Sequence, residues 1–500
     1  MDQLMLYHPS GARTATSLAL VWDKVPGAEC YQVLLNGRME GIAACTDYTA
    51  EQLRPETSYI CEVRAVARDG KLLAQSNTLA ASTKRQGELF DIRDFGAKGD
   101  GITLNTEAIQ AAINACSEEG IVYIPEGVFL TGALHLKSNM TLFIEKLGRL
   151  LGSADPADYP LTEYLWEGRK HLCYTSLLNA HEKEQRYCNI TIAGEGTIDA
   201  NGMRLFHAEM EEQAGKRGRA LYASHVDGLY LKDITVRQSP SWCIHPVLCT
   251  DVSMNHIKVY TREDEFGNRY KDIFNGDGID PESCRDVVIF HSLIASQDDC
   301  IAVKSGRDED GRKRGVPSEN IRITNCTFLS GFGVAMGSEM SGGIRNVLVQ
   351  DCVFEDAYSV GSVKAPLYRG GVIENITYAD CRISNYGEHR DTRWFRGAIY
   401  VDQYYHLETF DPDESHPVTE GTPVIRNITF RNIVLDTATG NAIFLAGLPE
   451  APLENITLEN VTALGKTGMK AYNIDGLHLK NVSVSAREGE AVMLHNVNEE

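Results

Sequence analysis

The chain has 500 residues, 43% hydrophobic and 23% charged, a composition typical of a soluble globular protein. This length exceeds one ordinary compact core, so we expect several domains or a repetitive solenoid. The formal net charge of −21 argues against nucleic acid as a partner, because its phosphates require a basic surface. No apolar run reaches the length of a transmembrane helix, about 18 residues, so no membrane partner is expected.

The N-terminal segment shows no basic region followed by an apolar stretch, so no secretory signal is predicted. The 13 cysteines are odd in number and lack the spacing of metal ligands or of a disulfide framework. Free thiols suit a reducing compartment. Both features predict a cytoplasmic protein, although a secreted protein lacking its leader would look the same.

Residues 1–84 form the first predicted unit, in which short apolar strands alternate with turn signals. Asn36-Gly37 and Asp69-Gly70 each separate two apolar runs, which is a strong hairpin signal. Strands at this spacing predict a small β-sandwich. The order of its large residues resembles that of a fibronectin type III domain: Trp22, Tyr31, Leu53 and Tyr59. This resemblance implies a spacer or docking module without chemistry of its own.

A helix is predicted from about residue 106, where apolar residues follow a helical i, i+3/i+4 spacing and Thr106 suits the start. Residues 85–500 otherwise read as strands, so this helix stands alone near the beginning of the second unit. We expect it to cap the open end of a solenoid, which would otherwise expose strand edges.

Beyond the helix a pattern recurs at intervals of roughly 20 to 40 residues, typical of stacked units. An asparagine or aspartate is followed by alternating apolar and polar residues, and this period of two predicts strands of a parallel β-helix. The pattern begins at Asn189, Asp251, Asp286, Asn320, Asn346, Asn375, Asn427 and Asn455. The sixth residue after several of these is apolar, as an interior ladder requires: Cys326, Cys352, Cys381, Ile433 and Val461.

Two acidic motifs interrupt this pattern, NGDGIDP (275–281) and SQDDCIAVKSG (296–306). Asp277 and Asp298 are 21 residues apart, about one rung, and rungs stack about 4.8 Å apart. Asp298 and Asp299 are adjacent, so both face solvent only if the chain bends between them. Crowded carboxylates raise at least one pKa, and a neutral acid beside an ionised carboxylate suits glycosidic cleavage. A calcium-binding cluster or a solvated turn fits the spacing equally well.

Residues 90–480 resemble glycoside hydrolase family 28, the polygalacturonase family, and most closely its exo-acting bacterial branch. The matching stretches in chain order are DFGAKGDG, GEGTIDANG, SPSWCIHPV, NGDGIDP, QDDCIAVKSG, GSEMSGGIRNV and RGGVIENI. The resemblance implies an all-β fold, a right-handed parallel β-helix. It also implies exo-acting, inverting hydrolysis of α-linked galacturonic acid in pectic oligosaccharides, with no metal or other cofactor.

The resemblance assigns roles to four residues. Asp298 would be the general acid, while Asp277 and Asp299 would hold and activate the water. An inverting enzyme is expected to hold its two carboxyl groups about 6.5–9.5 Å apart. Lys364 matches the lysine of the family's Arg-x-Lys motif and would bind the substrate carboxylate as a point charge.

The sequence departs from the family pattern at two positions. Phe332 stands where the family has the histidine of Gly-His-Gly, and Ser362 replaces the arginine of Arg-x-Lys. Arg369 is a candidate for the missing positive charge, and Phe332 for stacking on a sugar. His245 and Glu339, which lie in matching stretches, are further candidates for substrate binding.

Three other functions stay open at this point: a galacturonosidase acting on rhamnogalacturonan fragments, a calcium-dependent enzyme similar to pectate lyase, and a non-catalytic uronide-binding solenoid. Extra segments at 155–190, 261–274 and 390–420 are predicted to shape one end of the groove. The sequence predicts no oligomeric state.

Overall fold

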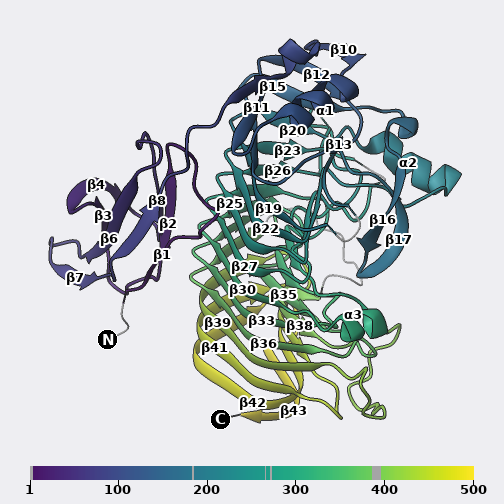
Figure 1. Cartoon of the computed structure of the whole chain (residues 1–500). Coiled ribbons are helices and arrows are strands. Elements are labelled where there is room, and N and C mark those ends of the chain that lie inside the picture. The colour runs from purple at the N-terminus through teal and green to yellow at the C-terminus, as the bar shows by residue number, and fades with distance from the viewer. Residues whose placement is uncertain (1–3, 183–184, 265, 271–272, 386–395, 500) are drawn as a thin grey trace.

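A small β-sandwich lies beside a long parallel β-helix in the computed structural model (Figure 1). Within the described residues, no helix is both long enough and apolar enough to span a bilayer. The structure describes residues 4–182, 185–264, 266–270, 273–385 and 396–499.

The sandwich packs two antiparallel sheets around a separate core that includes Trp22 and Tyr31. Asn36 and Gly37 have φ of 51° and 74°, the left-handed values that a two-residue hairpin requires, so this predicted hairpin is confirmed. The fibronectin type III likeness and the boundary at residue 84 stay predictions. One sheet contains β1 (Leu6–Tyr7), β2 (Leu18–Trp22) and β5 (Asp47–Ala50). The other contains β4 (Arg38–Ala43), β3 (Cys30–Leu35), β6 (Ser58–Val66), β7 (Leu72–Gln75) and β8 (Leu79–Ser82).

The β-helix has three faces of parallel strands around one continuous core. The first face contains β9 (Leu89–Asp91), β11 (Gly120–Ile124), β14 (Met140–Ile144), β19 (Tyr187–Ala193), β22 (Val226–Lys232), β25 (Thr250–Asn255), β27 (Arg285–Phe290), β30 (Ser318–Thr324), β33 (Ile344–Gln350) and β36 (Val372–Ala379). The second contains β10 (Asp100–Leu104), β12 (Gly127–Thr131), β15 (Gly148–Gly152), β20 (Thr197–Asp199), β23 (Thr235–Arg237), β26 (Lys258–Tyr260), β28 (Leu293–Ala295), β31 (Thr327–Ser330), β34 (Val353–Glu355) and β37 (Arg382–Asn385).

The third face carries the candidate site and is called the site face. It contains β13 (Leu134–His135), β18 (Leu178–Ala180), β21 (Leu221–Ser224), β24 (Ile244–Val247), β29 (Ile301–Val303), β32 (Val334–Met336), β35 (Gly361–Lys364), β38 (Gly397–Asp402) and β40 (Asn441–Ala446). The last strands run through more than one face: β39 (Val424–Thr437), β41 (Leu453–Gly465), β42 (Thr467–Ala486) and β43 (Val492–Glu499).

The repeated asparagines and aspartates have a structural cause. All eight predicted leading residues have φ between 51° and 58°, a left-handed conformation that Asn and Asp tolerate better than other side chains. Their side chains also form a ladder, because Asn375 donates to Asn346 at 3.2 Å and Asn427 donates to Asn375 at 3.1 Å. The interior positions six residues later are all buried, as predicted.

The predicted helix is α1 (Thr106–Ala115), and its side chains Ile109, Ala112 and Ile113 are buried in the solenoid core. It therefore caps the N-terminal end of the β-helix, as expected. The other helical elements are η1 (Ile92–Phe95), η2 (Pro156–Asp158), α2 (Met203–Glu212) and α3 (Asp308–Arg314).

The sandwich packs against the outside of the first face, away from the site face. Ala19 and Val21 of β2 form an apolar cluster with Tyr230 and Phe290 of the solenoid. Asp47 accepts a hydrogen bond from His291 at 2.8 Å beside this cluster. Apolar and charged contacts therefore hold the two units together.

Candidate active site

Two neighbouring rungs of the site face bring the three predicted aspartates together. Asp277 precedes Ile279, which bridges β24 to β29, and Asp298 and Asp299 precede β29. Asp298 and Asp299 line the same pocket as Asp277, so the chain does bend between them as predicted. The amide of Asp299 donates to Asp298 Oδ1 at 2.9 Å, which fixes this bend.

The aspartates lie in a pocket of about 380 Å³. Each of the three extra segments contributes to its wall: Glu167 from the first, Phe274 from the second and Tyr405 from the third. The prediction that they shape the groove is confirmed for these residues, and positions 386–395 lie outside the described residues. The rest of the lining is Trp242, Asn275, Lys304, Arg307, Phe332, Ser338, Glu339, Lys364, Arg369 and His406.

The three carboxylates of the trio are crowded. One oxygen from each of Asp277, Asp298 and Asp299 lies within 4.8 Å of the others. The expected range of about 6.5–9.5 Å refers to the distance between whole carboxyl groups rather than between their nearest oxygens, so the spacing expectation stays a prediction.

Crowding and burial perturb the titration of the trio. Burial raises the pKa of Asp277 well above its ordinary value, and the Asp280 and Asp298 carboxylates raise it further. Burial and Asp299 also raise the pKa of Asp298. Asp277 and Asp299 are buried whereas Asp298 is half-buried, so Asp298 is the most accessible acid of the three.

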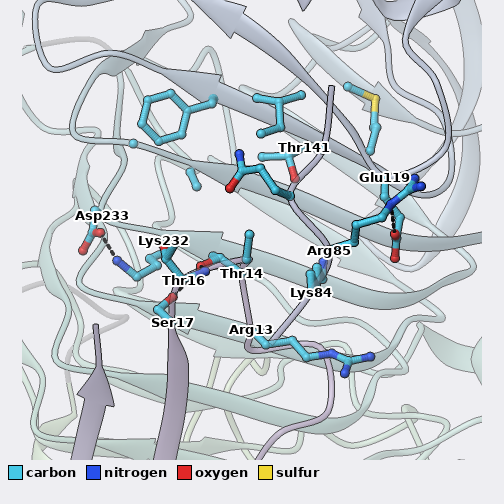
Figure 2. A pocket seen from close by; sticks show the side chains of 18 of the residues that line it. Arg13, Thr14, Thr16, Ser17, Lys84, Arg85, Glu119, Thr141, Lys232 and Asp233 are labelled. Atoms are coloured by element: carbon cyan, nitrogen blue, oxygen red, sulfur yellow. Dashed lines mark hydrogen bonds and ion pairs between the residues drawn. The ribbon is translucent and has the colours of Figure 1, made fainter. Parts of the chain in front are cut away.

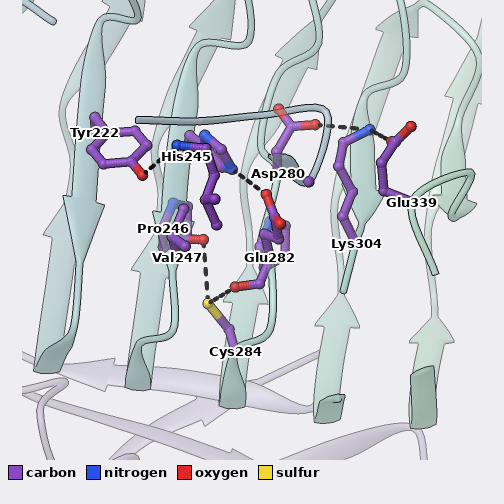
Figure 3. A network of polar contacts seen from close by, with 12 residues as sticks. Tyr222, His245, Pro246, Val247, Asp280, Glu282, Cys284, Lys304 and Glu339 are labelled. Carbon is purple, nitrogen blue, oxygen red and sulfur yellow. Dashed lines mark hydrogen bonds and ion pairs between the residues drawn. The ribbon is translucent and has the colours of Figure 1, made fainter. Parts of the chain in front are cut away.

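A buried lysine, Lys304, forms ion pairs with Asp280 and Glu339 next to the aspartate trio (Figure 3). Lys304 Nζ lies 3.1 Å from Glu339, 3.6 Å from Asp280 and 3.8 Å from Asp277. Burial acts to lower the pKa of Lys304, but these carboxylates outweigh it and raise the pKa well above its ordinary value. Lys304 is therefore a permanent cation beneath the pocket.

A second lysine, Lys364, supports Asp299, the other aspartate that was predicted to hold the water. Lys364 Nζ donates to both carboxylate oxygens of Asp299 at 2.8 Å. The structure places Lys364 in the pocket, as predicted, but its first partner is the aspartate. The sequence pattern assigned Lys364 to the substrate alone and did not indicate this bidentate ion pair.

Arg369 and Glu339 also lie in the pocket, as predicted. Arg369 Nη2 is 3.6 Å from Glu339 and 3.1 Å from His406 Nε2. Despite burial, Lys304 and Arg369 hold the pKa of Glu339 well below its ordinary value, so Glu339 is ionised. Glu339 thus fixes two cations at the pocket wall.

The two departures from the family pattern have different environments. Phe332 lines the pocket and stacks on Tyr358, with ring centroids 4.6 Å apart and an interplanar angle of 16°. Ser362 is fully buried on β35 and pairs in register with Tyr400 of β38. Ser362 therefore cannot replace the arginine as a substrate contact, whereas Phe332 presents its ring to the pocket.

His245 is not a pocket residue, which corrects the prediction of a groove-facing side chain. It is fully buried, 3.2 Å from Glu282, and packed between the rings of Tyr222 and Trp242 (Figure 3). The hairpin β16 (Leu161–Trp166) and β17 (Arg169–Tyr174) covers this rung, because Trp166 stacks on Trp242 at 5.7 Å. Burial lowers the pKa of His245 to about 4, so the ring is neutral at pH 7.

Nine residues of the pocket lining were not predicted from the sequence, and they include Glu167, Trp242, Lys304 and Arg307. Lys304 had a signal, because a lysine directly after the apolar run of β29 requires a buried partner. Arg307 and Glu167 form an ion pair in the pocket lining although they lie 140 residues apart in the chain, which no local pattern indicates.

The crowded carboxylate oxygens have the spacing of metal ligands. Lys364 already donates to both oxygens of Asp299, however, and Lys304 lies 3.8 Å from Asp277. Two ammonium groups at these positions repel a divalent cation and supply the charge compensation that it would provide. The donor set fits a metal poorly.

Similarity to known proteins identifies the family. The profile of glycosyl hydrolases family 28 matches residues 181–486, which is more than half of the chain. The chain belongs to this family. A profile described as rhamnogalacturonase A/epimerase, pectate lyase-like, matches residues 89–143.

Two curated relatives support the assignment. A probable polygalacturonase of Vitis vinifera is 30% identical over 80% of this chain and 78% of its own length. An exo-poly-alpha-D-galacturonosidase of Dickeya chrysanthemi is 30% identical over 71% of this chain, and the match spans 63% of that enzyme.

Solved structures agree on the fold. A Yersinia enterocolitica family 28 exopolygalacturonase superposes with a TM-score of 0.84 at 23% identity, covering 99% of both chains. A Thermotoga maritima exopolygalacturonase gives a TM-score of 0.64 at 26% identity, covering 83% of this chain and 92% of that one. The predicted right-handed parallel β-helix and glycoside hydrolase class are confirmed.

Proposed function

We propose that this family 28 hydrolase removes α-linked galacturonic acid from one end of pectic oligosaccharides. The observation that carries the proposal is the trio Asp277, Asp298 and Asp299 in a pocket that also contains the cations Lys304, Arg307, Lys364 and Arg369. The carboxylates supply acid–base chemistry, and the cations supply partners for a uronate. The exopolygalacturonase names of the Dickeya and Yersinia relatives point to the same substrate class.

The proposed reaction uses the carboxylates in different protonation states. Asp298, the most accessible acid with a raised pKa, donates its proton to the glycosidic oxygen as the bond to the anomeric carbon breaks. A water held by Asp277 and Asp299 attacks the same carbon and loses one proton to whichever carboxylate of this pair is ionised. Asp277 Oδ1 is buried and has no hydrogen-bond partner among the described residues.

The resemblance and the water-holding pair support inversion at the anomeric carbon. The alternative is retention, in which the second carboxylate attacks the sugar from a carboxyl group about 5–5.5 Å away. In the inverting reaction the base belongs to the pair that holds the water. NMR detection of the first anomer released distinguishes the two outcomes.

The pocket size supports exo action. Its volume of about 380 Å³ is near the lower end of the range of about 300–1,000 Å³ for small-ligand sites. Glu167, in the turn of the β16–β17 hairpin, forms an ion pair with Arg307 at the pocket wall, which joins this hairpin to the site face. Such a pocket encloses the end of a chain rather than a long internal stretch.

The test is product identification from trigalacturonic acid with the native protein and with Asp298→Asn. Monomer from the native protein alone supports the exo-hydrolase and the assigned acid. Equal release by the variant removes Asp298 from the acid role. Binding without turnover by the native protein points to the non-catalytic alternative.

A second candidate substrate is a rhamnogalacturonan fragment, favoured by Phe332 and Ser362 in place of the family's polar residues. A half-buried aromatic ring can stack on a sugar where the family has a histidine. Release from rhamnogalacturonan oligosaccharides, with none from trigalacturonic acid, would select this alternative.

We further propose a reducing compartment for the protein. All thirteen cysteines are free thiols, and most are buried in the cores. Free thiols in such number persist best where glutathione and thioredoxin keep them reduced. Localisation of a tagged full-length chain in its native cells tests this proposal.

A further inference from the structure

A crevice between the sandwich and the β-helix lies apart from the catalytic pocket (Figure 2). Its volume is about 390 Å³. The sandwich contributes the loop 13–17, the connecting segment contributes 84–87, and the first face contributes parts of β14, β19 and β22. Three separate parts of the chain thus converge on one enclosed space.

Five cations and five carboxylates line this crevice, but not all of them form ion pairs. Four of its five carboxylates have a cation partner, since Arg85 pairs with Glu119, Lys146 with Glu195, and Lys232 with both Glu51 and Asp233. The fifth, Glu145, accepts a hydrogen bond from Tyr123. Two cations, Arg13 and Lys84, have no carboxylate within ion-pair distance among the described residues.

The two unpaired cations are close enough to repel each other. Lys84 Nζ donates to Thr191 Oγ1 at 2.9 Å, and Arg13 donates to the carbonyl of Ser82 at 3.0 Å. Burial, together with repulsion from Arg13, lowers the pKa of Lys84 to about 8. Arg13 Nε is buried without an acceptor among the described residues. An anion bound beside Lys84 and the Arg13 guanidinium would relieve their repulsion.

The rest of the lining indicates a hydroxylated anion. Phe143 presents a half-buried ring to the crevice and stacks with Tyr123 at 6.1 Å and 16°. Thr14, Thr16 and Thr141 add hydroxyl groups. The aromatic ring, the hydroxyl groups and the two cations Arg13 and Lys84 together match a sugar ring that carries a carboxylate.

We propose that the crevice is a second binding site for a uronate sugar, held at its carboxylate by Lys84 and Arg13. The site is built jointly by the sandwich and the solenoid, which gives the sandwich a role in ligand binding. It can be occupied whether or not the catalytic pocket hydrolyses galacturonides, so its test does not depend on activity.

The test uses the reactivity of Lys84 itself in the native full-length protein. An amine with a pKa near 8 is acylated readily, and the extent at Lys84 is read by peptide mass spectrometry. Galacturonate at about ten times its Kd should slow labelling about tenfold, because roughly one molecule in ten stays free. Exposed Lys71 is the internal control and should label unchanged.

Two further arms test whether the carboxylate and Arg13 are responsible for the protection. Galactose, which lacks the carboxylate, should give no protection, and Arg13→Gln should abolish the protection by galacturonate while leaving labelling of the unliganded amine measurable. The proposal is overturned if the labelling of Lys84 is unchanged at every galacturonate concentration, up to a saturated solution. Protection by inorganic phosphate but not by galacturonate overturns the sugar assignment.

Discussion

Removal of the buried cation at Lys304 should shift the acid limb of the pH–rate profile. Lys304→Met deletes a charge 3.8 Å from Asp277 and leaves the side-chain volume similar. At an effective dielectric constant of about 20, this Coulomb interaction is worth about 4 kcal/mol, or about 3 pKa units. Water in the open pocket screens part of it, so we expect an upward shift of about 1 to 3 units.

The sign follows from the chemistry of the site. Lys304 stabilises the ionised form of Asp277, so its loss raises the pKa of the carboxylate trio, which titrates as a coupled group. Because the water-activating carboxylate must be ionised, kcat/KM falls at low pH and recovers as the pH rises. The assay is kcat/KM on trigalacturonic acid between about pH 3 and about pH 9, a range that spans the titration of ordinary and raised carboxylates.

Lys304→Arg is the matched control, since it keeps the positive charge and should leave the limb near its native position. Circular dichroism and thermal melting establish that each variant is folded. Suppose that the Lys304→Met variant is folded and active, and that the pKa of its acid limb lies within about 0.3 unit of the native value. Electrostatic support of Asp277 by Lys304 is then refuted.

Arg369, His245 and the two buried lysines each give a further prediction. Arg369→Ala should raise KM about 10- to 100-fold with a smaller effect on kcat, because a charge-assisted hydrogen bond is worth about 1.5–3 kcal/mol. Steady-state kinetics on trigalacturonic acid measure this effect, and an unchanged KM would show that Arg369 does not bind the substrate. His245→Gln should keep kcat/KM within about threefold of the native value and lower the free energy of unfolding in urea by about 1–3 kcal/mol, since its partner Glu282 is buried. A large loss of activity at unchanged stability would instead show that His245 acts in the catalytic pocket. Chelation with EDTA should leave the rate unchanged and added calcium should not raise it, because Lys304 and Lys364 occupy the metal-like positions; a calcium-dependent product absorbing in the ultraviolet would select the lyase alternative.

The fold was predictable because its structural repeat appears as local patterns in the sequence. The asparagine or aspartate that leads each repeated pattern adopts a left-handed φ, and the sixth residue after several of them is buried, so these two features keep a fixed separation along the chain. Asp277, Asp298 and Asp299 were also predictable, because the distance between the two motifs equals about one rung. Stacking then converts sequence spacing into spatial proximity.

The rest of the site depends on contacts that no local pattern encodes. His245 lies on the correct face, but the β16–β17 hairpin covers its rung and buries the ring. The pairing of Lys364 with Asp299 joins side chains 65 residues apart, and its geometry depends on how the rungs stack.

Exo-hydrolysis by this pocket can be decided with hexagalacturonic acid labelled at its reducing end. Early products are separated by chromatography at low conversion. We expect galacturonic acid monomer as the first small product, with any labelled intermediate only one residue shorter than the substrate. Labelled dimers and trimers appearing at the same time as the monomer would show internal cleavage and contradict a pocket that encloses only the end of the chain.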